Sequence, residues 1–167
     1  MLRAATAISL LLFFAFPAMA HIVAKPDTGE RGAWFLTNLI VSHGCDKAAT
    51  TKITVTVPKN ILIIKPQVKP GWKIEIVKRK LDKPIKGPHG DITEVTDTIS
   101  WTGKLPDEYF DKFGLSMKLP KEVETIYLPT LQQCGKASRD WKDISMEGMK
   151  HDEKSSPAPA IKIVPKN

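Results

Sequence analysis

The chain has 167 residues, two cysteines and a formal net charge of +7 at pH 7. Its lysines are scattered, with no arginine-rich block and no interleaving of basic and aromatic residues, which indicates a solvated surface rather than a nucleic-acid interface. It also lacks the Gly-x-Ser-x-Gly and His-Glu-x-x-His motifs and a phosphate-binding glycine loop, so it carries no signature of the common hydrolase or nucleotide-binding classes.

The first 20 residues are predicted to be a secretion signal. Arg3 precedes an apolar run from Ala7 to Phe16, and Ala18-Met19-Ala20 supplies the small residues of a cleavage site. The apolar run is shorter than the about 20 residues that span a membrane, and no later segment approaches that length. We therefore expect a mature chain that begins at His21, has no transmembrane segment, and is periplasmic or secreted.

A mature chain that begins at His21 has a potential metal chelate at its end. The free α-amine, with an ordinary pKa near 8, and the imidazole of the same residue can bind one metal ion. Nitrogen ligands of this kind suit Cu(II), which has the highest affinity in the divalent series. A histidine can also follow a signal by chance, so the junction alone does not establish copper binding.

Residues 21–145 are predicted to form one domain of short strands separated by turns. Lys52–Val57 alternates polar and apolar residues, as a strand with one buried face does. Lys78–Gly90 is rich in lysine, proline and glycine and is expected to be a mobile loop, and Leu105–Phe110 a turn. Further strands are predicted at Ile22–Lys25, Ala33–Val41, Ile61–Ile64, Trp72–Ile76, Asp91–Trp101, Phe113–Leu119, Thr125–Leu128 and Trp141–Ile144. About seven to nine strands without an amphipathic helix predict an all-β sandwich.

Residues 146–167 are predicted to be a flexible polar tail. Ile161–Val164 could add a last edge strand to the domain. Met146, Met149 and His151 offer soft ligands and an imidazole, so an alternative function of this tail is to carry Cu(I).

The two cysteines, Cys45 and Cys134, both lie in the exported part of the chain. A single pair in an oxidising compartment usually forms a disulfide, which here would close a long loop and stabilise the fold by about 2–4 kcal/mol. The alternative is a thiolate copper site, which the wide separation of the two residues disfavours.

An ordered set of motifs resembles the YcnI-like copper-binding domain family of exported bacterial proteins. The resemblance covers about residues 20–145. The matching elements are Ala20-His21, His43-Gly44-Cys45-Asp46, Thr50-Thr51-Lys52, Lys65-Pro66-Gln67, Lys69-Pro70-Gly71-Trp72, Ile99-Ser100-Trp101-Thr102-Gly103, Phe110-Asp111-Lys112-Phe113, Leu119-Pro120, Gln132-Gln133-Cys134 and Trp141.

The resemblance implies an immunoglobulin-like or cupredoxin-like β-sandwich that binds one Cu(II). The family's ligand is the mature N-terminal histidine, through its amine and imidazole, with a carboxylate and a tryptophan near the metal. These roles fall here on His21 and Trp141. The family's association with copper handling outside the cytoplasmic membrane implies the copper ion, and other exported or membrane copper-handling proteins, as partners.

The carboxylate is where this sequence departs from the family pattern. Lys112 stands at the position that aligns best with the family's glutamate, and an ammonium group cannot donate a lone pair to a metal. Either Asp111 or Glu108 supplies the oxygen, or the site is weakened. We favour Asp111 because it lies close to the matched Phe113, although adjacent side chains of a strand point to opposite faces.

These features predict a copper-binding protein, a Cu(II) metallochaperone or copper-homeostasis factor, rather than an enzyme. One alternative is an immunoglobulin-like exported interaction module that binds no metal, which Lys112 favours. Another is a copper-dependent redox enzyme, which would need a second histidine, and His43 is the candidate in an ordered region.

Overall fold

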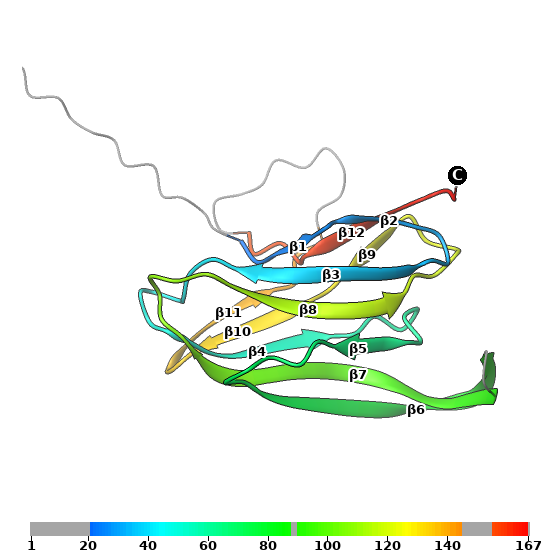
Figure 1. Ribbon diagram of the computed structural model, residues 1–167, viewed down its shortest axis with the longest axis horizontal. Helices are drawn as coiled ribbons and strands as arrows, with labels where there is room; N and C mark the ends of the chain where they lie inside the picture. The colour runs from blue at the N-terminus through cyan, green and yellow to red at the C-terminus, as the bar shows by residue number, and fades with distance from the viewer. Residues whose placement is uncertain (1–20, 88–89, 145–154, 167) are drawn as a thin grey trace, which may run out of the picture.

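The computed structural model describes residues 21–87, 90–144 and 155–166, which form twelve strands and their connections (Figure 1). The predicted signal at 1–20 and the tail residues Met146, Met149 and His151 lie outside the described residues. The strands are β1 (Val23–Lys25), β2 (Thr28–Glu30), β3 (Trp34–Val41), β4 (Thr50–Thr56), β5 (Ile64–Pro66), β6 (Lys73–Gly87), β7 (Gly90–Leu105), β8 (Asp111–Lys118), β9 (Thr125–Tyr127), β10 (Thr130–Cys134), β11 (Ala137–Trp141) and β12 (Ala160–Val164).

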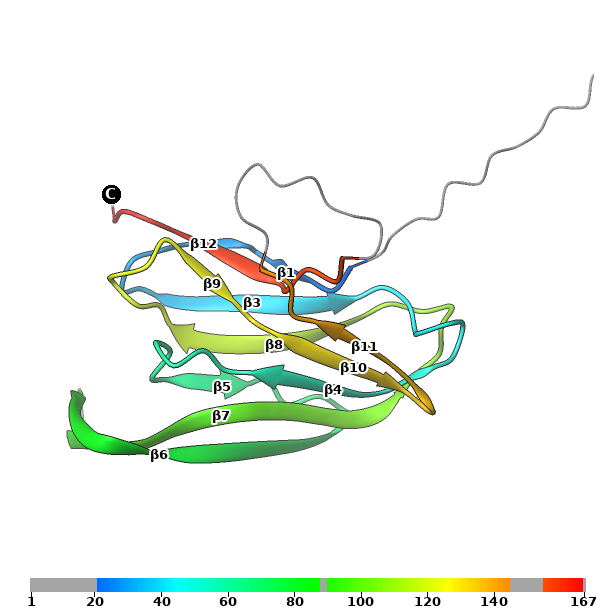
Figure 2. The ribbon, with the colours of Figure 1, turned by 180° about the vertical axis from the view of Figure 1, so that it is seen from behind.

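Two antiparallel sheets form a sandwich, which confirms the predicted all-β class. One sheet has four strands in the order β1-β3-β8-β5, and the other has five in the order β11-β10-β4-β7-β6. In Figure 1 the four-stranded sheet lies in front, and Figure 2 shows the five-stranded sheet from behind.

Alternating apolar residues fill the space between the two sheets. Leu39 of β3 pairs with Phe113 of β8, and Ile53 of β4 pairs with Trp101 of β7; all four side chains are fully buried. The rings of Trp101 and Phe113 meet across the sandwich, with centroids 5.5 Å apart. Because the core-facing residues recur at every second position, burial fixes the register of these strands.

A third sheet, in the order β2-β12-β9, corrects the prediction for the C-terminal segment. Ala160–Val164 is the central strand of this sheet, parallel to β2 and antiparallel to β9, and not an edge strand. Ile161 and Ile163 are buried in the core on either side of exposed Lys162. This alternation gives the segment one apolar face, so it packs as part of the domain rather than extending from it as a free tail.

Of the segment predicted to be a mobile loop, residues 78–87 belong instead to β6 and Gly90 begins β7, and the long β6–β7 hairpin extends beyond the rest of the sandwich in Figure 1. Beyond the predicted strand Trp72–Ile76, most of β6 is exposed, so its residues do not alternate between core and solvent and give no period-two signal. Its charged side chains pair across the hairpin instead, in the ion pairs Lys78–Glu94, Arg79–Asp97 and Lys86–Asp91.

The structure also differs from the sequence prediction at one predicted strand and at one hairpin. The apolar run Ile61–Ile64 is not a strand, because β5 begins at Ile64 and Ile61 is buried in the preceding turn. The β10–β11 hairpin was not predicted. Its turn contains Gly135, whose φ of 63° lies in the left-handed region that glycine adopts without strain.

Candidate metal centre

The structure brings two of the candidate site residues, His21 and Trp141, into contact. His21 lies two residues before β1 and is half-buried, whereas Trp141 ends β11 and is buried. Their ring centroids are 5.7 Å apart and the ring planes are inclined by 62°, which is an edge-to-face arrangement. β1 and β11 are edge strands of the two facing sheets, so the contact lies at the margin of the sandwich.

Each of these two side chains is held by its own strand. The backbone just after His21 is fixed because Val23 pairs with Ile40 of β3. Trp141 pairs with Thr130 of β10, and its Nε1–H donates a hydrogen bond of 3.1 Å to Oε1 of Gln132. The guanidinium carbon of Arg139 lies 5.6 Å from the centre of the Trp141 ring, within the range of a cation–π contact.

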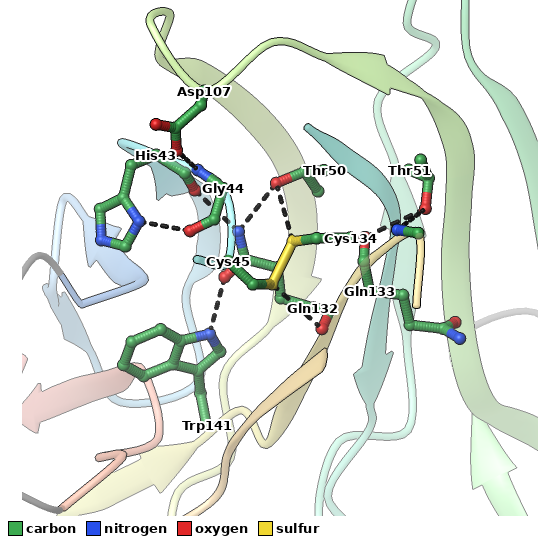
Figure 3. The surroundings of a disulfide bond; sticks show 11 residues. His43, Gly44, Cys45, Thr50, Thr51, Asp107, Gln132, Gln133, Cys134 and Trp141 are labelled. Atoms are coloured by element: carbon green, nitrogen blue, oxygen red, sulfur yellow. Dashed lines mark hydrogen bonds between the residues drawn. A yellow bond between two sulfur atoms is a disulfide. The ribbon is translucent and has the colours of Figure 1, made fainter. Parts of the chain in front are cut away.

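The predicted disulfide is present and lies beside this centre (Figure 3). Cys45, in the loop after β3, is bonded to Cys134 at the end of β10, with their Cα atoms 5.6 Å apart. Both residues are buried. Because a disulfide offers no thiolate, the alternative of a thiolate copper site is wrong for this structure.

The loop that carries His43 is tightly constrained. Nδ1 of His43 contacts the carbonyl oxygen of Gly44, and the Gly44 amide donates to Oδ1 of Asp107 at 2.7 Å. A side chain at Gly44 would bring its Cβ to 1.7 Å from the carbonyl oxygen of Ala48, so only glycine fits here. The loop is also attached to the Trp141 side, because Nε2 of Gln132 donates to the carbonyl oxygen of His43 at 2.8 Å.

The favoured candidate carboxylate, that of Asp111, makes its hydrogen bonds with Lys69 and Lys112. Asp111 accepts hydrogen bonds from Nζ of Lys69 at 2.6 Å and from the amide of Lys112 at 2.8 Å. It lines a pocket with Lys69, whereas His21 lines a different pocket. Glu108 is exposed. Within residues 21–87, 90–144 and 155–166, no group of three or more His, Cys, Asp or Glu residues could hold a metal ion.

The donors present fit a chelate made by one residue. His21 supplies an imidazole and, when the chain begins there, an α-amine, and both are nitrogen ligands suited to Cu(II). Trp141 offers an apolar ring rather than a lone pair, so it would cover the ion and not ligate it.

The sequence did not single out Gln132 or Arg139. Gln132 stands in the motif Gln132-Gln133-Cys134, but the motif does not tell which glutamine faces the core. The alternation of β10 would have shown it, since Thr130, Gln132 and Cys134 are all buried.

The fold and the histidine–tryptophan contact define an immunoglobulin-like β-sandwich protein with a candidate metal centre where its first strand begins. The family described as "Domain of unknown function (DUF1775)" matches residues 21–163. The chain therefore belongs to this family, the YcnI-like family that its motifs indicate.

One relative is the "Copper-binding protein CutI" of Bacillus subtilis (strain 168), which is 30% identical over 115 residues. The match covers 68% of this chain and 50% of the relative, so the chain spans about half the length of that protein. An uncharacterized protein from Nocardia farcinica, solved as an immunoglobulin-like fold, superposes with a TM-score of 0.62 at 21% identity. That likeness covers 86% of this chain and 97% of the other, and it confirms the fold. Across the described residues, no helix is long and apolar enough to cross a membrane.

Proposed function

We propose that the protein captures Cu(II) outside the cytoplasmic membrane, with the α-amine and imidazole of His21 as its chelating pair. The observation that carries the proposal is the contact between the His21 and Trp141 rings at 5.7 Å. The name of the Bacillus subtilis relative, a copper-binding protein, supports the choice of metal. Copper is the cargo in this proposal.

The chain's own residues would prepare His21 for the ion. Pairing of β1 with β3 restricts where the end of the chain can lie, so less backbone freedom is lost when an ion binds. The buried indole of Trp141 covers one side of the imidazole and excludes water there. His21 is half-buried, so part of the residue remains accessible from solvent.

We further propose that the chelate works without the carboxylate of Asp111. That carboxylate is already bonded to the Lys69 ammonium and to the Lys112 amide. Both bonds end on Oδ1, and the ion pair with Lys69, whose two side chains are 16% and 32% exposed, restrains where the carboxylate can move. Solvent can supply oxygen ligands more readily than a carboxylate held in this way.

A chelate contributed by one residue suits a copper carrier or homeostasis factor in the periplasm or outside the cell. The ion is held by nitrogen atoms of a single chain end, so a partner protein can replace them one at a time. Such a partner would be another exported or membrane copper-handling protein.

The proposal is tested by titrating Cu(II) into protein that begins at residue 21, together with His21→Ala and His43→Ala. We expect His21→Ala to lose high-affinity binding and His43→Ala to keep it. If His43→Ala abolished binding and His21→Ala did not, the chelate would lie elsewhere.

A further inference from the structure

We infer that Gln132 is a positioning residue that holds the Trp141 indole against His21. Its consequence for copper rests on the proposed function, whereas its consequence for the indole does not. Gln132 lies in the middle of β10, which pairs with β11 on one side and with β4 on the other. Its side chain is buried, with 1% exposed.

The side-chain amide of Gln132 makes three hydrogen bonds, with both of its N–H donors in use. Oε1 accepts from Nε1–H of Trp141 at 3.1 Å, and Nε2 donates to the His43 carbonyl and to Oγ1 of Thr50, both at 2.8 Å. An indole N–H can only donate and a backbone carbonyl can only accept, so these two partners define which way the amide points. If the amide were reversed, its NH₂ group would face the indole N–H and its oxygen would face the His43 carbonyl oxygen, so neither hydrogen bond could form.

The same amide is anchored beside the disulfide (Figure 3). A disulfide sulfur has no proton, so it is the Thr50 hydroxyl that donates to Sγ of Cys134, at 3.8 Å. Sγ of Cys45 lies 3.9 Å from the carbonyl oxygen of Gln132. Through Gln132, the indole is therefore connected by hydrogen bonds to Thr50 of β4 and to the His43 loop, and through Thr50 to the disulfide.

Gln132 explains why the Trp141 ring has one orientation. Arg139 and His21 contact the ring, whereas the N–H of the ring donates to Gln132. Without the Gln132 oxygen, the buried N–H would lose its hydrogen bond, and the ring would turn or the site would admit water to recover one. Either change would alter the surface that His21 meets.

The neighbouring residue offers a matched control. Gln133 is half-exposed, and Figure 3 shows its side chain directed away from Trp141. Gln132→Met and Gln133→Met therefore make the same chemical change on opposite faces of β10, and methionine retains most of the glutamine volume without its hydrogen bonds.

The first readout needs no copper. In the protein beginning at residue 21, we expect the Trp141 indole N–H signal to exchange slowly with water and to show a proton–proton contact with the His21 ring. Gln132→Met should speed the exchange and weaken that contact, whereas Gln133→Met should change neither. An indole unaffected by Gln132→Met would overturn the inference, whether or not copper binds.

The second readout is Cu(II) affinity. Loss of an outer partner of a metal site typically costs about 10–100-fold, and we expect a loss in that range from Gln132→Met and none from Gln133→Met. Gln132→Met should have no further effect in a Trp141→Phe background, because Gln132 acts through the indole. Additive effects would contradict this. If the unmutated protein bound no copper, the proposed function would fail while the indole readout still decided the role of Gln132.

Gln132→Glu is a second variant that tests the role of Gln132 if Gln132→Met does not fold. A neutral carboxyl has one carbonyl oxygen and one O–H, so it can accept from Trp141 and donate to the His43 carbonyl. Ionisation removes that donor but keeps an oxygen that accepts from the Trp141 N–H. We therefore expect Gln132→Glu to keep the slow indole exchange in both forms. Fast indole exchange in a folded Gln132→Glu variant would count against the inference.

Discussion

The imidazole of His21 meets the indole of Trp141 edge to face, although one residue precedes the first strand and the other ends the eleventh. His21 lies two residues before β1, which is an edge strand of one sheet, and Trp141 ends β11, which is an edge strand of the facing sheet. The contact makes the segment that precedes β1 part of the folded domain, and several measurable consequences depend on it.

Trp141→Phe should destabilise the fold as well as alter the candidate centre. Phenylalanine keeps an aromatic ring but removes the N–H that pairs with Gln132, which leaves a buried amide oxygen without its donor. We expect a loss of about 1–3 kcal/mol in the free energy of unfolding, measured by denaturant titration. Trp34→Phe is the control, because Trp34 is 59% exposed, and it should change stability by less than about 0.5 kcal/mol. Equal effects of the two changes would contradict the network.

The C-terminal strand should contribute to stability like any core strand. Ile161 is fully buried, and Ile161→Ala should cost about 2–5 kcal/mol through lost burial and the cavity left behind. Lys162→Ala, at the next and exposed position, should be close to neutral. The comparison is made by thermal or denaturant unfolding. A negligible effect at Ile161 would mean that β12 is not part of the cooperative domain.

The Lys78–Glu94 ion pair of the β6–β7 hairpin should make the stability of the fold depend on pH in a definite direction. The Lys78 ammonium donates a hydrogen bond to Glu94 and lowers the pKa of Glu94 below its ordinary value of 4.5. A lowered pKa means that the pair stabilises the fold above the unfolded-state pKa and that this contribution is lost as pH falls through the folded-state pKa. Carbon-detected titration should show the Glu94 midpoint shifted down and Lys78→Met moving it back up. A midpoint that does not respond to Lys78→Met would show that the pair does not persist in solution.

Asp111→Asn should leave copper affinity unchanged. The carboxylate is bonded to Lys69 and lines a pocket that does not include His21. Calorimetric titration of Cu(II) into Asp111→Asn and Lys69→Met would check this. A marked loss of affinity in Asp111→Asn, with a gain in Lys69→Met, would instead make Asp111 a ligand restrained by its lysine.

Strands with one buried face could be predicted from sequence. β3, β4 and β8 alternate core and solvent positions, so their period-two patterns are explicit, and the single cysteine pair predicted the crosslink. The exposed part of β6 could not be predicted in the same way, because neither of its faces is in the core.

The candidate site was predicted in part, through likeness to a family and not through local pattern. The sequence named His21 and Trp141, but only the folded chain shows that the two rings touch. The partner of the Asp111 carboxylate, Lys69, is remote in sequence and became visible only with the pairing of strands. Which of the adjacent glutamines faces the indole likewise depends on the register of β10.

The most direct test of the account uses the same polypeptide before and after release of its first residue. The domain is fused through a linker to a carrier protein, and a protease then removes the carrier so that His21 is left first. We predict that release strengthens Cu(II) binding by more than the roughly 10–100-fold that an outer-shell partner is worth, because release creates a ligand. Equal affinity of the fused and released chains would contradict the amine–imidazole chelate.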